Sequence, residues 1–252
     1  MDKEANKLTR PPYDIRKLVF IWVIHIITLA ACLLWYHGDL AVTWPSKVLA
    51  LSWFVMSSTA IAAGYHRLFS HRTYQASQLL IIFYLLAGAA AFQGPARQWS
   101  AQHRDHHTYV DQDKDPYNIK QGFWYAHMGW VVRLTSPDYT RVRDLDKDPL
   151  VMAQYEHFHL VAFFTSFILP GLIALAWGEA LAGLLIAGCL RLTIQWHMTF
   201  CVNSVAHYWG AQKYTKANSA RGNWWLSFLV WGEMDHNFHH AFPEDFRTGT
   251  RW

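Results

Sequence analysis

Residues 158–200 read FHLVAFFTSFILPGLIALAWGEALAGLLIAGCLRLTIQWHMTF. Two apolar stretches, residues 158–177 and 180–200, are joined here by only Gly178 and Glu179. Each stretch matches the roughly 20 residues that an α-helix needs to cross the ~30 Å hydrocarbon core of a bilayer. Because a two-residue connection suits an antiparallel helix hairpin, the segment predicts two adjacent membrane-spanning helices.

Three more apolar stretches lie nearer the N-terminus, at residues 18–36, 48–65 and 79–92. The first two are also long enough to span a bilayer. The third has only 14 residues, and runs of about 10–14 usually lie in the membrane interface or inside the protein. We therefore expect an all-α integral membrane fold in a single domain, residues 1–252, with four spanning helices and one interfacial helix.

Lys and Arg predict how these helices are oriented. The N-terminal segment carries five Lys or Arg residues, residues 66–157 carry ten and the part after residue 200 carries five. The two hairpin loops hold only Lys47. By the positive-inside rule, both termini and a helical lobe of residues 97–156 and 204–252 should face the cytoplasm, at a bacterial inner membrane or an ER-type membrane. The basic residues do not cluster, so no nucleic acid is expected as a partner.

Composition agrees with a membrane protein. The chain is 52% hydrophobic and 16% aromatic, with 14 Trp, against about 45–50% apolar residues in an average soluble domain. The three cysteines, Cys32, Cys189 and Cys201, all lie in apolar stretches. We expect them to be reduced packing residues rather than disulfide or zinc ligands.

Four motifs hold nine of the fifteen histidines: HRLFSH (His66, His71), HRDHH (His103, His106, His107), NSVAH (His207, with Asn203) and HNFHH (His236, His239, His240). Residues three or four apart share one face of a helix. Adjacent residues diverge by about 100°, so each HH pair suits two different metal ions. His66 and His71 are five apart, and we expect the helix to unwind between them.

Neutral imidazole binds iron, zinc, copper and nickel. Nine imidazoles exceed what one ion accepts, so the motifs predict two metals at one cytoplasmic rim. The other six histidines are expected to be structural: His25, His37, His127, His157, His159 and His197. Among these, His197 lies near the end of the last span. Spacing alone leaves the metal open between zinc and non-haem iron.

Longer strings resemble the membrane fatty-acid desaturase family, most closely its stearoyl-CoA desaturase branch. They are GYHRLFSHRTY, HRDHHTY followed by DKDPYN, GFWYAHMGW, NSVAHYWG and GEMDHNFHHAFPEDF. The resemblance implies two irons, one bound by His66, His71 and His107 among others. It also implies that Asn203 reaches an iron through water. Glu233 and Asp235 precede the last motif and are candidate partners for the imidazole N–H groups.

The resemblance further implies an O2-dependent oxidoreductase that introduces a cis double bond, at carbons 9 and 10, into a long-chain saturated acyl-CoA. Electrons would come from a separate cytochrome b-type or ferredoxin-type carrier, since no fused carrier domain is evident. Phe54 and Ser58 occupy the positions that set acyl-chain length in related enzymes. Two alternatives remain open: a hydroxylase or alkane monooxygenase on the same scaffold, and a membrane metal transporter.

One departure from the family concerns the acyl carrier. Animal acyl-CoA enzymes have Arg-Asp directly before the HxxHH motif, where this chain has Ala101 and Gln102. Those residues help to hold the CoA phosphates in the family. Arg97, Lys120 and Arg133 are candidates to replace them here.

Overall fold

The structure, a computed structural model, describes residues 10–227, 230–233 and 235–249. The regular elements among these residues are helices, accompanied by three isolated β-bridges. The predicted all-α class is therefore confirmed. Residues 1–9 and 250–252, for which a cytoplasmic position was predicted, lie outside the described part.

Four helices in the described part are long and apolar enough to cross a membrane. The first is α1 (Ile15–His37). The second is α2 (Trp44–Thr59) with its π-helical continuation η1 (Ala60–Ser70). The third joins α5 (Pro149–Phe163), η6 (Phe164–Ile168), α6 (Leu169–Ala174) and η7 (Leu175–Trp177). The fourth joins α7 (Ala180–Ala182), η8 (Gly183–Leu190) and α8 (Arg191–Tyr208). All four contain the apolar stretches expected from the sequence.

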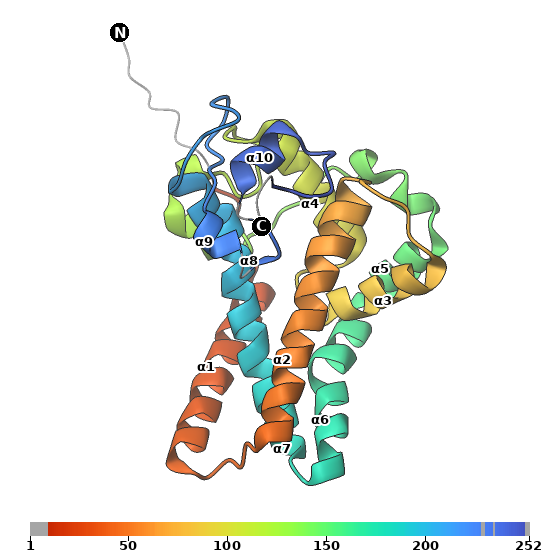
Figure 1. Cartoon of the computed structure of the whole chain (residues 1–252), viewed down its shortest axis with the longest axis vertical. Helices are drawn as coiled ribbons and strands as arrows, with labels where there is room; N and C mark the ends of the chain where they lie inside the picture. Colours follow the sequence, from red (N-terminus) through yellow and green to blue (C-terminus); the bar gives the residue numbers. More distant parts are fainter. Residues whose placement is uncertain (1–9, 228–229, 234, 250–252) are drawn as a thin grey trace.

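The fifth apolar run forms α3 (Gln78–Ala89), which is too short for a span. It runs across the long helices rather than along them, as Figure 1 shows, and packs against η1 and α5. The remaining helices are α4 (Ala96–Tyr109), α9 (Trp224–Ser227) and α10 (His236–Ala241), with short turns η2 (Ile119–Gln121), η3 (Tyr125–Gly129), η4 (Tyr139–Val142) and η5 (Leu145–Lys147). Helices α4, α9 and α10 gather at one end of the bundle (Figure 1).

Local sequence explains where these helices begin. Asp14 precedes α1, and its side chain accepts hydrogen bonds from the backbone N–H groups of Arg16 and Lys17. Ser77 accepts from the N–H of Leu80 at the start of α3. Such side chains satisfy backbone donors that the first helical turn leaves without partners.

The hairpin predicted at Gly178 and Glu179 depends on close packing. Gly178 has φ +81°, a conformation that residues with a side chain rarely adopt. The carboxylate of Glu179 accepts from Ser46 Oγ at 2.6 Å, which ties the hairpin to α2. A Cβ on Gly183 would lie 2.4 Å from the carbonyl oxygen of Pro170, so the two helices approach as closely as they do because residue 183 is glycine.

Buried polar groups join the helices below the histidine-bearing end. The guanidinium of Arg191, 2% exposed, donates to the carbonyl oxygens of Ala90, Ala187 and Ser166 and to Gln195 Oε1. The outer face of α1, by contrast, leaves large apolar side chains exposed, among them Trp22 at 62%. Apolar side chains on the outside, with the few buried polar groups hydrogen-bonded inside, fit a bilayer-embedded helix bundle.

Candidate metal centre and substrate cavity

Five histidines from three elements form a first group: His66, His71, His103, His107 and His239. Each offers one ring nitrogen, and these nitrogens all lie within 4.8 Å of one another. His71 Nε2 and His103 Nε2 are 2.8 Å apart, and His239 Nε2 lies 3.1 Å from His66 Nε2 and 2.9 Å from His107 Nε2. Two nitrogen ligands about 2.1 Å from one ion, at right angles, would be about 3 Å apart.

A π-helix brings the first two ligands together. The N–H of His71 donates to the carbonyl oxygen of His66 at 3.0 Å, an i to i+5 bond. The two rings then lie 4.8 Å apart by their centroids. The helix widens here instead of unwinding, so the unwinding expected from the sequence is wrong. π-Helical hydrogen bonding within an α-helix is frequent at functional sites.

Four histidines form a second group: His106, His207, His236 and His240. His240 Nε2 lies 3.2 Å from His106 Nε2 and 3.1 Å from His236 Nε2. Adjacent histidines of the HH pairs serve different groups, as the helical geometry predicts. His106 and His107 separate in this way along α4, and His239 and His240 along α10.

The second ring nitrogen of two of these histidines contacts an acidic side chain. His106 Nδ1 donates to Asp115 Oδ1 at 2.8 Å, and His66 Nδ1 lies 2.8 Å from Glu233 Oε2. With the proton on Nδ1, a neutral imidazole presents a bare lone pair on Nε2. The Nε2 atoms of both rings face other Nε2 atoms, an arrangement that a shared cation stabilises.

Burial favours the uncharged form of three histidines of the first group. It lowers the pKa of His103, His107 and His239 well below the ordinary histidine value, and neighbouring imidazoles lower it further. Neutral imidazole is the form that binds metal. His207 Nε2 is buried and has no hydrogen-bond partner among the described residues. An orphaned ring nitrogen beside three others fits a metal ligand.

The other residues predicted beside the metals take different positions. Glu233 is buried and also accepts from Arg67 Nη2 at 2.9 Å. Asn203 lies on α8, one turn before His207, and lines the cavity described below. Asp235 precedes α10, and its carboxylate faces the backbone of Gly222 and Gly249.

Sequence reasoning missed three partners of the histidines. They are Asp115, which accepts from His106, Tyr117, whose hydroxyl lies 3.2 Å from His103 Nδ1, and Ser219, whose hydroxyl lies 2.8 Å from His207 Nδ1. Asp115 and Tyr117 belong to the turn-rich string DKDPYN. Both are deeply buried, 3% and 6% exposed, and the sequence carries no signal of that burial.

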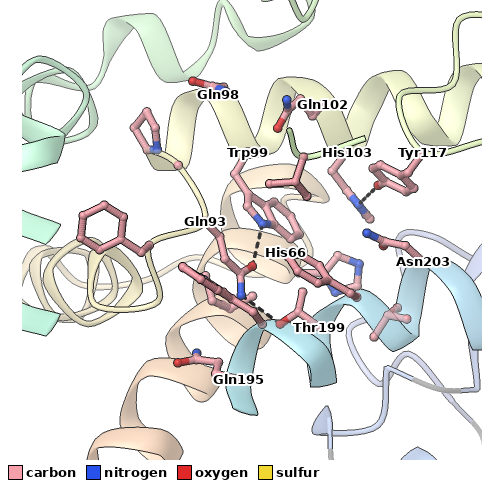
Figure 2. A pocket seen from close by; sticks show the side chains of 18 of the residues that line it. His66, Gln93, Gln98, Trp99, Gln102, His103, Tyr117, Gln195, Thr199 and Asn203 are labelled. Carbon is pink, nitrogen blue, oxygen red and sulfur yellow. Dashed lines mark hydrogen bonds between the residues drawn. The ribbon is translucent and has the colours of Figure 1, made fainter. Parts of the chain in front are cut away.

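A cavity of about 940 Å³ reaches both histidine groups. His66 and His103 of the first group and His236 of the second line it, together with Asn203. Figure 2 shows His66, His103, Tyr117 and Asn203 on the same side of the cavity. Apolar side chains make up most of the rest of the wall, including several aromatic rings: Phe20, Phe92, Phe158, Phe163, Trp196 and Phe200.

Three side chains of the cavity wall, between α4 and α8, are joined by hydrogen bonds. Gln93 Nε2 donates to Thr199 Oγ1 at 2.9 Å, and Trp99 Nε1 donates to Gln93 Oε1 at 3.3 Å (Figure 2). Ser58, predicted as a substrate residue, also lines the cavity. Phe54, predicted with it, is not among the described residues of the wall.

The three cations suggested for the carrier are not part of this cavity wall. Arg97 Nε pairs with Asp146 at 2.6 Å. Arg133 is buried, stacks over the Tyr13 ring at 3.6 Å and so fastens the segment before α1. Lys120 is exposed. Two other cations, Arg16 and Lys17 at the start of α1, do line the cavity.

The remaining histidines include one connected chain. His25 Nε2 lies 3.1 Å from His197 Nε2, and His197 Nδ1 lies 3.0 Å from His127 Nε2. His127 Nδ1 continues to Ser204 Oγ at 2.9 Å. These rings link α1, α8 and η3 and belong to neither ligand group.

Comparison with known proteins shows the family. The fatty acid desaturase family pattern matches residues 42–252. A probable acyl-CoA desaturase of Schizosaccharomyces pombe is 48% identical over 209 residues, and acyl-CoA desaturase 1 of Saccharomyces cerevisiae is 37% identical over the same length. Each alignment covers 81% of this chain, but only 44% and 41% of the two yeast proteins. The chain thus spans less than half the length of these relatives.

Animal relatives align over nearly the whole chain. The Delta(9)-fatty-acid desaturase fat-7 of Caenorhabditis elegans is 33% identical over 260 residues, 98% of this chain and 75% of the relative. Stearoyl-CoA desaturase of Sus scrofa is 33% identical over 264 residues, 100% of this chain and 71% of the relative. With its helix bundle and its two histidine groups, the chain belongs to the fatty acid desaturase family.

Proposed function

We propose that the protein is an integral membrane acyl-CoA desaturase that introduces a cis double bond, at carbons 9 and 10, into a long-chain saturated acyl-CoA. One observation carries this proposal: a largely apolar cavity of about 940 Å³ is lined by histidines from both ligand groups. An acyl chain in that cavity would pass beside both groups. The names of the relatives, acyl-CoA, stearoyl-CoA and Delta(9) desaturases, support the same substrate.

Two irons are the proposed cofactors. The nine histidines would hold them, one ion in each group, since five and four neutral imidazoles suit two centres better than one. Removal of hydrogen from an unactivated methylene pair needs an oxidised metal, which no amino-acid side chain replaces. Asn203, at the cavity wall, is proposed to reach an ion through water, and Glu233 and Asp235 to support the ligands from behind.

The chain's own residues would position the substrate and exclude water. Aromatic side chains wall the cavity and favour a bound hydrocarbon chain, with about 0.8 kcal/mol for each buried methylene. The bonds from Trp99 to Gln93 and from Gln93 to Thr199 hold the wall rigid beside His66. A rigid wall keeps one methylene pair next to the metals, which is the main contribution that a protein makes to such a reaction.

The reaction consumes one O2, two protons and two electrons, and converts one methylene pair into a double bond with release of two waters. We propose that a separate cytochrome b-type or ferredoxin-type protein delivers the electrons at the end of the bundle that carries α4 and α10. By the distribution of Lys and Arg, that end faces the cytoplasm. The acyl carrier would be held by cations there, from Arg97, Lys120 and Arg133 or from Arg16 and Lys17 at the cavity wall.

Neither alternative has the same support. A hydroxylase or alkane monooxygenase would use similar ligands, but the relatives named above are desaturases. A transporter would distribute its ligands along a path through the spans. Here the two groups that the described residues form lie together at one end of the bundle, around α4 and α10 (Figure 1).

Expression in a host that lacks its own desaturase tests the proposal. Mass spectrometry that locates double bonds should detect monounsaturated chains with the bond at carbon 9, in cells that carry the wild-type gene. The His106→Ala variant should bind less iron and produce none. Hydroxylated products would favour the monooxygenase alternative. Purified, metal-loaded protein that consumes no O2 with stearoyl-CoA and an electron donor would contradict both enzymatic functions.

A further inference from the structure

A loop outside the metal-binding motifs contacts one of the proposed ligands. Residues 209–223 connect α8 to α9, and within this loop the hydroxyl of Ser219 lies 2.8 Å from His207 Nδ1. Asp111, just after α4, contacts the same serine. Its Oδ2 accepts from the Ser219 N–H at 2.6 Å, and its Oδ1 accepts from the Ser219 hydroxyl at 2.5 Å.

Counting hydrogens along this series determines which nitrogen of His207 carries its proton. A carboxylate can only accept, so the single hydroxyl hydrogen of Ser219 is donated to Asp111. The Ser219 oxygen can then only accept from His207, whose proton must be on Nδ1. The Nε2 atom of His207 is left with a bare lone pair. This is the nitrogen that is buried without a hydrogen-bond partner in the described part of the chain.

The loop is held on its other side by α10. Asn237, 1% exposed, accepts from the backbone N–H groups of Tyr214 and Thr215 through Oδ1. Its Nδ2 donates to the carbonyl oxygens of Thr215 and Ala220. Since Ala220 follows Ser219, these bonds fix the serine between two helices that both carry histidines of the second group.

We propose that Asp111 is a positioning residue that acts through Ser219 to hold His207 in the metal-binding tautomer. The proposal rests on the metal centre proposed above. Asp111 carries this role because its acceptor-only carboxylate sets the direction of every hydrogen bond in the series. Residues of this kind, one contact away from a ligand, typically change metal affinity by about 10- to 100-fold when they are replaced.

The Asp111→Asn variant should reverse the series. Its carbonyl oxygen keeps the bond from the Ser219 N–H, and its NH2 group donates to the Ser219 hydroxyl oxygen. The hydroxyl hydrogen then turns to His207 Nδ1, and the imidazole proton moves to Nε2, where it blocks metal binding. Ser219→Ala removes the connection without imposing the wrong tautomer. We therefore expect the larger loss of metal in Asp111→Asn.

The test measures metal bound per purified protein and the rate at which excess chelator removes it. Asp111→Asn should release metal at least about 10-fold faster than the wild-type protein. Ser219→Ala should release it more slowly than Asp111→Asn does. The double variant should behave like Ser219→Ala alone, because residue 111 can no longer act on His207. Ser219→Thr, which keeps the hydroxyl, should retain wild-type behaviour. Asp113→Asn, an exposed carboxylate in the same segment, is the matched control.

The outcomes separate the two proposals. Wild-type protein without bound metal would overturn the metal centre and this inference together. Metal-loaded wild-type protein with unchanged release from Asp111→Asn and Ser219→Ala would overturn this inference alone. Additive losses in the double variant would show that Asp111 acts by another route. Thermal unfolding of the metal-free variants reports whether a loss reflects folding, and Ser219→Ala, which deletes one oxygen, keeps the test valid if Asp111→Asn fails to fold.

Discussion

Asp115 illustrates what individual residues contribute to this site. Its carboxylate accepts from His106 and from the backbone N–H groups of Asp111 and Tyr117. It therefore orders the turn after α4 and orients a proposed ligand at the same time. The sequence shows only one aspartate among several in a segment of turns, and nothing in its spacing from His106 distinguishes it from Asp113.

Replacing Asp115 by Ala should weaken metal binding by about 10- to 100-fold, because His106 would lose the acceptor that fixes its tautomer and ring orientation. Bound iron by elemental analysis, with and without chelator challenge, checks this expectation. Asp113→Ala serves as the control, since Asp113 is exposed. Equal metal retention in the two variants would contradict the role assigned to Asp115.

Ser58 is the residue where substrate length can be tested. It lines the cavity, and an indole at this position would exclude the end of a long acyl chain. Each methylene that cannot enter forfeits about 0.8 kcal/mol, roughly fourfold in kcat/KM. Ser58→Trp should thus shift products toward shorter chains. The fatty-acid profile of expressing cells measures this shift, with Phe54→Trp as a control outside the described cavity wall. An unchanged profile in Ser58→Trp would remove it from the substrate site.

Helical elements determine how the ligands converge. The π-helix η1 places His66 and His71 one wide turn apart, and α4 directs His106 and His107 into different groups. The division of adjacent histidines between the two groups follows from the 100° rotation per residue and was predictable. The π-turn was not, because its wider i to i+5 hydrogen bonding depends on the helices packed around it rather than on residues 60–70 alone.

The close packing of the last two spans can be tested with a glycine substitution. Gly183→Ala would put a Cβ 2.4 Å from the Pro170 carbonyl oxygen and 2.6 Å from Ala174 Cβ, so the helices would have to separate. We expect a loss of about 1–3 kcal/mol in the free energy of unfolding. Thermal unfolding in detergent measures it. Gly171→Ala, whose nearest contact would be 3.5 Å, should be close to neutral, and equal stability of both variants would contradict the packing argument.

At the scale of the whole molecule, the four spans place the histidine-bearing elements on one face. Apolar length alone identifies the spans. Because α3 is too short to cross the membrane, the histidines that precede it and those that follow it stay at the same end of the bundle. Arg191 completes the arrangement, since it bonds to carbonyl groups of Ala90 and Ser166 from elements far apart in the sequence. Arg191 stands inside an apolar stretch of the sequence, and its partners followed only from the packed bundle.

Orientation in the membrane is testable with single cysteines in a protein whose Cys32, Cys189 and Cys201 are replaced by Ala. A cysteine at position 113 should react with a membrane-impermeant thiol reagent only after the cells are permeabilised, because the ligand-bearing end is proposed to face the cytoplasm. When the protein is expressed in a bacterial inner membrane, a cysteine at position 39, in the loop after α1, should react in intact cells. The opposite labelling pattern would reverse the proposed orientation.

The sequence by itself determined the helix class, the four spans and the nine histidines proposed as ligands, because hydropathy and helical spacing are local properties. Only the tertiary structure decided how those histidines divide into groups of five and four, which carboxylates support them, and that Ser219 lies beside His207. These contacts join residues up to about 170 positions apart, such as His66 and His239. Pairing over such distances depends on how the helices pack against one another, and no local pattern encodes it.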